Sequence, residues 1–255
     1  MHDLLQDIFD NAEYVLDKAE SFSIRIKYLM LQRTKTESVR YGIDVLKQLG
    51  ESLSETPSKI SVMYQFLKTR MMLRKKEAEM LLYMTGMANK LVGLKIRILT
   101  TVCLIGLGGH QELCAISGLR IVQLTLQHGY SKWSAFGVAM YGILWIQIRG
   151  DVRMARRLGQ LAIKLYERSQ IKELMTAVFV IVYGLILPRS EDLVSVCVPQ
   201  LKKAALVSRS LDEIYRGVHA DNVVCQFTLN AGRPLDEVSE MMKTCCENAR
   251  QYNLE

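Results

Sequence analysis

The chain has 255 residues and a formal net charge of +7, with 49% hydrophobic and 23% charged residues. This balance excludes an intrinsically disordered chain and is typical of a folded, largely helical protein with a substantial core. The longest uncharged runs, 133–148 and 174–188, fall short of the roughly 20 apolar residues that cross a bilayer core. We therefore expect a protein without a membrane span, and a cytoplasmic one because the acidic N-terminus does not resemble a secretory signal.

The net charge fits three kinds of partner: nucleic acid, an anionic membrane surface or an acidic protein. Basic residues concentrate only at 68–76 and 149–168, and neither segment has the interleaved aromatic residues of a platform that binds single strands. A solvated helix face is the favoured interpretation of both. Nucleic-acid binding is the less favoured alternative.

The first predicted elements are three amphipathic helices, over residues 4–16, 21–33 and 36–49. Thr36 is expected to cap the third helix. Gly50 is expected to end it. The apolar stripe of that helix consists of Val39, Ile43, Leu46 and Leu49.

A polar linker at 51–58 follows, since Pro57 disfavours a helix at the residue before it. A helix is predicted over 60–74, a loop over 81–88, and a helical pair over 89–107 and 111–128.

Around Arg149–Gly150–Asp151 the sequence predicts a helical hairpin. Gly150 can adopt the left-handed conformation that closes one helix, and Asp151 can accept the free N–H groups that open the next. The second helix is apolar on one face only. That face consists of Val152, Ala155, Leu158, Leu161, Ala162 and Leu165.

Two further pairs complete the chain, at 173–187 with 192–208 and at 211–230 with 235–252. Pro199 is expected to kink or interrupt the helix that contains it. No segment has the alternating pattern of a strand over a useful length.

The breaks within these pairs lie near residues 34, 109, 150, 190 and 232, so the last four are about 40 residues apart, a period typical of helical solenoids. We predict one all-α domain over 1–255, an α-solenoid of hairpins like tetratricopeptide repeats. Its expected parts are an N-terminal hairpin region (1–50), a linker (51–58), middle repeats (59–129) and C-terminal repeats (130–255).

Several segments resemble a known family. They are YGIDVLKQLG at 41–50, Gly118–Tyr130 with the following run to Glu167, and NAGRPLDEVSE at 230–240. These resemble the tetratricopeptide-like helical region of very large signalling ATPases. In that family a protein-kinase-like domain and an AAA-type ATPase module precede the helical repeats, and GAF and histidine-kinase or cyclase domains often follow them.

The resemblance implies a scaffold for protein–protein interaction or for signal relay within a larger protein. The chain has no phosphate-binding G-x-x-x-x-G-K-[ST] loop and no H-R-D or D-F-G kinase motif. We therefore expect no enzymatic activity and no cofactor in this chain. The alternative is that it is part of a nucleotide-dependent enzyme whose catalytic domains lie outside it.

Cysteine and histidine residues provide the candidate chemical sites. Zinc prefers such ligands, but Cys103, His110 and Cys114 lack a C-x-x-C spacing, and buried packing is favoured over metal binding. A nucleophile at Cys225 beside His219 and Asp221 is likewise disfavoured. The adjacent Cys245 and Cys246 face different directions on a helix. All six cysteines, which also include Cys197, are expected to be reduced and buried.

Two candidate surfaces remain. Methionines are crowded at 71, 72, 80, 84 and 87, where they form either an adaptable binding surface or irregular core packing, with core packing favoured. Local basic density makes four arginines the best candidates for binding an acidic protein partner or a neighbouring domain. These are Arg149, Arg153, Arg156 and Arg157.

Overall fold

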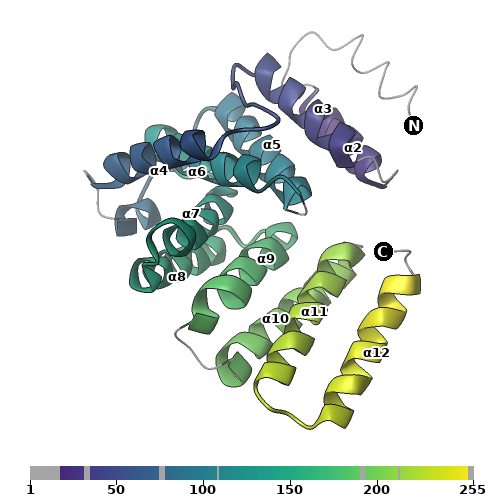
Figure 1. The fold of residues 1–255 in the computed structure, drawn as a ribbon. Coiled ribbons are helices and arrows are strands. Elements are labelled where there is room, and N and C mark those ends of the chain that lie inside the picture. The colour runs from purple at the N-terminus through teal and green to yellow at the C-terminus, as the bar shows by residue number, and fades with distance from the viewer. Residues whose placement is uncertain are drawn as a thin grey trace. The chain divides into compact units, whose positions relative to one another are not determined.

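The computed structural model describes residues 18–31, 35–74, 78–107, 109–189, 193–211 and 213–251. Within these ranges the chain is helical and contains no strand, only an isolated bridge between Gly86 and Tyr130 (Figure 1). The all-α prediction is confirmed. In the described part, no helix is both long and apolar enough to cross a membrane. The helix expected over 4–16 lies outside the described residues.

The helices alternate with short connections, and their bounds follow the predicted ones closely except for the pair predicted over 173–187 and 192–208. The α-helices are α2 (Ala19–Leu31), α3 (Lys35–Gln48), α4 (Lys59–Arg74), α5 (Lys90–Gly106), α6 (Gln111–His128), α7 (Ser134–Arg149), α8 (Val152–Ser169), α9 (Lys172–Phe179), α10 (Val198–Ser210), α11 (Ile214–Asn230) and α12 (Leu235–Gln251).

The chain divides into two compact units, one ending at Gly137 and the other beginning at Val138, so α7 contributes to both. In the first unit α3 packs against α2 and α5, and α6 packs against α4 and α5. In the second unit α9 packs against α8 and α10, and α11 packs against α10 and α12. Figure 1 shows this succession of neighbouring helices within each unit. Each helix thus buries its apolar face against a helix that is near in sequence.

Local signals set most of the helix ends. Asn89 caps α5, since its Oδ1 accepts hydrogen bonds from the backbone N–H groups of Leu91 and Val92 at 3.0 and 3.2 Å. Gly50 and Gly150 end their helices with positive φ angles of 77° and 65°. The prediction for Thr36 is wrong, because α3 already begins at Lys35 and the Thr36 residue lies inside the helix.

A glycine at the end of α6 allows a close backbone approach. Gly129 has φ 101° and ψ 179°, a region essentially restricted to glycine, and a Cβ built there would lie 2.8 Å from the Thr85 carbonyl oxygen. The approach lets the Tyr130 N–H donate to Thr85 and the Met87 N–H donate to Tyr130. The segment 83–89 is therefore a fixed connection, and the loop predicted over 81–88 begins after the 3₁₀ helix η1 (Ala78–Leu82).

Prolines explain where the structure departs from the helix predicted over 173–187. After α9 the chain continues as a π-helix, η2 (Val180–Ile186), and then as a 3₁₀ turn, η3 (Leu187–Arg189). Pro188 has no N–H to donate and its ring clashes with the carbonyl four residues earlier, so a wider turn before it relieves the clash.

The same arrangement recurs before Pro199. A π-helix, η4 (Leu193–Cys197), precedes α10, in whose first turn Pro199 lies. The expected interruption at this proline is confirmed, because the helix changes its hydrogen-bonding pattern at Val198.

A polar network fixes α4 and the linker to α6 inside the first unit. The Arg120 guanidinium donates to both carboxylate oxygens of Glu51, at 2.6 and 3.0 Å, and to Gln123 Oε1 at 2.6 Å. Gln123 Nε2 in turn donates to Gln65 Oε1 at 3.0 Å and to Thr69 Oγ1 at 2.9 Å on α4. Glu51, Gln123 and Thr69 are buried. A buried charge is tolerated only when it is paired in this way.

Glu51→Ala should lower the free energy of unfolding by about 3 kcal/mol, because it leaves Arg120 without its buried counter-charge. Glu55 in the same linker is the matched control, since its ion pair with Arg40 is exposed and Glu55→Ala should cost less than about 1 kcal/mol. Urea unfolding followed by circular dichroism measures both values.

A double variant separates lost pairing from lost volume. Glu51→Leu with Arg120→Met removes both charges and should be more stable than Glu51→Leu alone. If the losses of unfolding free energy in Glu51→Leu and in Arg120→Met simply add in the double variant, the proposed coupling between the two charges is contradicted.

Candidate interaction surface on helix α8

Helix α8 is built as a ridge with one buried face. Asp151 caps it, accepting a hydrogen bond from the Met154 N–H at 2.9 Å. The predicted apolar stripe is confirmed for five of its six residues, since Ala155, Leu158, Leu161, Ala162 and Leu165 are at most 5% exposed, whereas Val152 at the start of the helix is only half-buried. Neighbouring helices approach closely here: a Cβ added at Gly142 of α7 would lie 3.4 Å from Leu158 Cβ. The helix therefore has a fixed orientation, with its other face toward solvent.

The solvent face of α8 is strongly basic. Arg153, Arg156 and Arg157 are all exposed, and a helical step of about 100° per residue puts them within about 100° of one another. Arg149 is exposed at the last position of α7, just before the turn. The structure therefore brings three of the four predicted arginines onto one helix face and leaves the fourth at the end of the preceding helix.

Only one acidic residue, Glu167, lies on α8 with these arginines. Exposed Lys164 and Arg168 continue the same face toward the C-terminus of the helix. A guanidinium binds a carboxylate through two parallel hydrogen bonds, which favours a partner rich in Asp or Glu. The guanidinium groups of this face are therefore chemically suited to anionic groups.

The metal candidate has a different arrangement from a zinc site. Cys103 and Cys114 are buried and face each other from α5 and α6, where Cys114 Sγ donates to the Cys103 carbonyl at 3.2 Å and Cys103 Sγ to the Cys114 carbonyl at 3.5 Å. Burial raises the pKa of the Cys103 thiol well above its ordinary value, and the neighbouring Cys114 raises it further. His110 immediately precedes α6. Among the described residues no cluster of metal-ligating side chains is found.

Cys225, His219 and Asp221 lie on α11. Burial raises the pKa of the Cys225 thiol, and the Asp221 carboxylate raises it further, so the thiol stays protonated near neutral pH. Asp221 is ion-paired with Arg209, while His219 is exposed. A nucleophilic cysteine needs a lowered pKa, which is the opposite of what this environment produces.

The expectation that every cysteine is buried is wrong for the last two. Cys245 is half-buried, with Sγ 3.7 Å from the Val218 carbonyl, whereas Cys246 is exposed. The reason is that α12 has a neighbour only on its α11 side in the described chain, and Val238 is the one α12 residue buried there.

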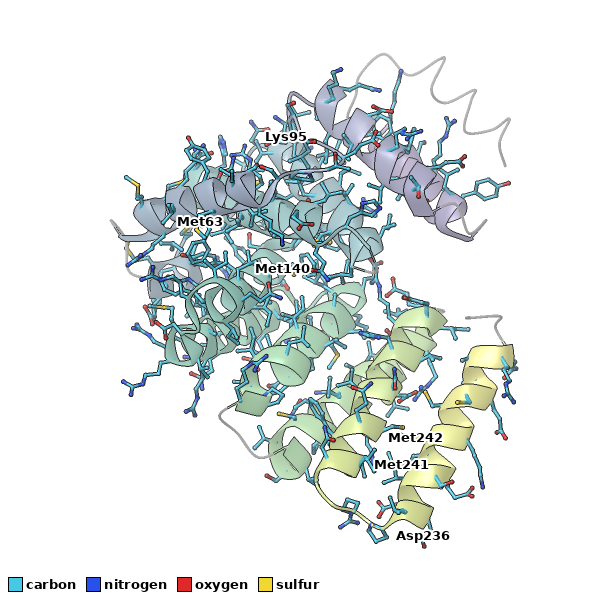
Figure 2. The ribbon with its side chains drawn as sticks, viewed as in Figure 1. Met63, Lys95, Met140, Asp236, Met241 and Met242 are labelled. Carbon is cyan, nitrogen blue, oxygen red and sulfur yellow. The ribbon has the colours of Figure 1, made fainter. Side chains whose placement is uncertain are left out.

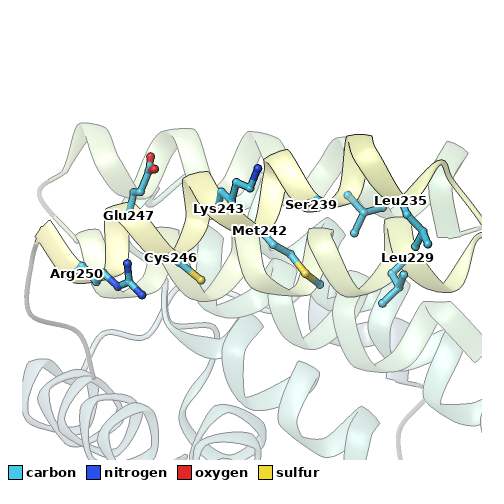
Figure 3. A pocket seen from close by; sticks show the side chains of 9 residues that line it. Leu229, Leu235, Ser239, Met242, Lys243, Cys246, Glu247 and Arg250 are labelled. Carbon is cyan, nitrogen blue, oxygen red and sulfur yellow. The ribbon is translucent and has the colours of Figure 1, made fainter.

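A shallow groove of about 460 Å³ runs along α12 beside the end of α11. Its apolar part includes Leu229, Met242 and Cys246, while Lys243 and Glu247 line its edge. Figure 3 shows Met242 and Cys246 on the opposite side of α12 from Glu247. Figure 2 labels Met241 and Met242 on the same helix. The groove has mixed apolar and charged chemistry.

A second exposed surface was not predicted from the sequence. Helix α4 carries a row of large, solvent-exposed apolar side chains. The methionine-rich region predicted over 71–87 follows this row in the sequence. Met71 and Met80 are exposed, whereas the methionines at 72, 84 and 87 are half-buried. The available signal was the apolar spacing at 60, 63, 64, 67 and 71, which is distinct from the spacing of the buried residues 62, 66 and 69.

Comparison of the chain with protein-family models, curated proteins and solved structures gives no match. The described residues themselves define an all-helical protein with a basic face on α8 and an exposed apolar row on α4.

Two thiols with raised pKa values, Cys103 and Cys245, predict how stability depends on pH. Burial is the main cause of both shifts. It raises the pKa of Cys103 above the ordinary thiol pKa of 9.0 and raises the pKa of Cys245 to about 11. The folded chain therefore holds these protons more tightly than the unfolded chain. The contribution of both thiols to stability is complete below pH 9 and is lost as the pH rises above that value, for Cys245 toward about 11.

As the pH rises from about 9 to about 11, the urea concentration at the midpoint of unfolding should therefore decrease. The decrease should be less steep in Cys103→Ala. Equal slopes for wild type and Cys103→Ala would contradict the assignment.

Proposed function

We propose that the chain is a helical-repeat scaffold, an α-solenoid of hairpins like tetratricopeptide repeats, that serves protein–protein interaction or signal relay. Helices α5, α7, α9 and α11 begin at intervals of about 40 residues, which supports a repeat of one hairpin. Packing between helices that are neighbours in sequence supports it as well. The resemblance to large signalling ATPases adds a specific form of the proposal, in which the partner is a neighbouring domain of the same protein.

The observation that carries the functional proposal is the basic face of α8. Its arginines are exposed on a helix whose opposite face is buried in the core, so the core sets the direction in which this face points. Four basic side chains within the nine residues from Arg149 to Arg157 create a local positive potential that attracts acidic segments and speeds their association. We assign this face to an acidic protein partner.

The repeat proposal predicts a gradient of hydrogen exchange. Each unit of a repeat protein is stabilised by its neighbours, and α12 buries only Val238 whereas α5 buries ten residues. Amides of α12 should exchange at least about tenfold faster than those of α5. Native-state exchange read by mass spectrometry measures this, and uniform protection across the two helices would contradict the repeat model.

Charge reversal tests the basic face. Changing Arg153, Arg156 and Arg157 each to Glu should weaken binding of a fluorescent Glu-rich peptide by at least about tenfold, because the attraction becomes repulsion. The control reverses three exposed lysines of the same unit, Lys172, Lys202 and Lys203, and changes the net charge equally. Fluorescence anisotropy gives both affinities, and circular dichroism checks that helicity is unchanged.

A duplex DNA probe measured in parallel distinguishes the nucleic-acid alternative. Binding of the duplex in preference to the peptide, with a steep dependence on salt, would replace the protein-partner proposal. Equal peptide binding by both triple variants would reject a specific role for the arginines.

A further inference from the structure

Helix α4 has two apolar faces. Val62, Phe66 and Thr69 are buried on one side, where α4 packs against α6. On the other side five large apolar residues are at least 43% exposed, which we call the α4 stripe. They are Ile60 (82%), Met63 (43%), Tyr64 (63%), Leu67 (44%) and Met71 (69%). Figure 2 labels Met63 on this helix.

The α4 stripe has the geometry of a helix-packing surface. At about 100° per residue its five members lie within about 100° of the helix circumference, and they extend over about 17 Å along the axis. Ile60 with Tyr64 forms one row at a spacing of four residues, and Met63, Leu67 and Met71 form a second. The groove between two such rows receives the side-chain ridge of another helix.

Basic residues border the α4 stripe on both sides. Measured around the helix axis from the centre of the stripe, the same helical step places Lys68 about 80° to one side. It places Lys59 and Arg70 about 80–100° to the other side. The segment from Lys59 to Arg74 contains four basic residues and no acidic residue. An apolar seam between two basic borders is complementary to a helix with an apolar seam between acidic borders.

We propose that the α4 stripe docks an amphipathic helix of a partner protein whose apolar seam is bordered by Asp or Glu residues. Met63 and Met71 suit this role because unbranched, polarisable side chains adapt to the shape of an incoming ridge. Tyr64 adds a large, rigid contact of the type that dominates binding energies. This surface lies in the first unit and is independent of the basic face of α8.

Two other occupants fit the observations less well. A second copy of this chain docked through the same face would bring two sets of Lys59, Lys68 and Arg70 together, and like charges at an interface cost several kcal/mol. Helices that lie on a membrane surface keep their charges on the face opposite the apolar one. In α4 that opposite face is occupied by the core, and the basic residues lie beside the stripe.

The test uses the full chain and a fluorescent helical peptide of about four turns, with Leu at the spacing i, i+3, i+4 and i+7 and Glu on both sides. We expect the wild-type chain to bind it and Met63→Gln and Leu67→Gln each to weaken binding about tenfold. Leu206→Gln is the matched control, since Leu206 is 63% exposed on α10, and it should change the affinity less than twofold.

Charge gives a second arm. A peptide with Lys in place of Glu should bind at least about tenfold more weakly, and Lys68→Glu with Arg70→Glu should reverse that preference. In the background of the α8 triple arginine variant the amphipathic peptide should still bind, and Leu67→Gln should still weaken that binding about tenfold, so failure of this proposal is distinguishable from failure of the α8 proposal.

Four results would overturn the proposal. The first is the absence of peptide binding, and the second is equal binding by Leu67→Gln and wild type. The third is sedimentation with phosphatidylserine vesicles that Met63→Gln and Leu67→Gln abolish, which would assign the stripe to a membrane surface. Light scattering that shows a dimer dissociated by Leu67→Gln would instead assign it to a second copy.

Discussion

The buried hydrogen-bond network around Arg120 determines how α4 is oriented. Arg120 is held between Glu51 and Gln123, and Gln123 reaches two side chains of α4, so the linker, α4 and α6 share one set of polar contacts. Apolar packing alone would not select between the two faces of α4, because both carry large hydrophobic side chains. The network does select, since turning α4 over would leave the buried Gln123 Nε2 without its partners Gln65 and Thr69. One polar cluster therefore decides which apolar face of α4 meets the core.

The exposed face of α4 adds little to folding. A side chain that stays in water in both the folded and the unfolded chain contributes almost nothing to the difference between them, whereas burial contributes about 25 cal/mol per Å². The gain from covering Ile60, Tyr64 and Met71 is consequently available to an association instead of to folding. The same reasoning applies to α12, which has one buried residue and a groove edged by Lys243 and Glu247. Apolar surface in this protein is thus divided between interhelical packing and surface that remains open.

Sequence patterns predicted those features that depend on nearby residues. Gly150, Asp151 and the stripe from Ala155 to Leu165 specify the α7–α8 hairpin locally, and the basic positions of α8 follow because a helix with one apolar face must expose the other. Long-range choices could not be predicted in this way. From the sequence alone Glu51 is an ordinary polar linker residue, because its partner Arg120 is distant in sequence. The two apolar faces of α4 likewise cannot be separated in the sequence, where they form one hydrophobic helix. The π-helical turns before Pro188 and Pro199 were missed because the proline rule predicts an interruption without specifying its geometry.

The surfaces on α8 and α4 differ in the forces that they can exert. Attraction by the α8 arginines acts over roughly a Debye length, about 8 Å at physiological ionic strength, so it raises the rate of encounter and weakens as salt increases. Contact with the α4 stripe removes apolar surface from water, which requires direct contact and prolongs the lifetime of a complex. The basic residues beside the stripe select among apolar partners, since a helix bordered by Lys or Arg would meet repulsion at Lys68 and Arg70. Specificity on α4 therefore arises from charge at the border, while its affinity arises from the apolar seam between the charges.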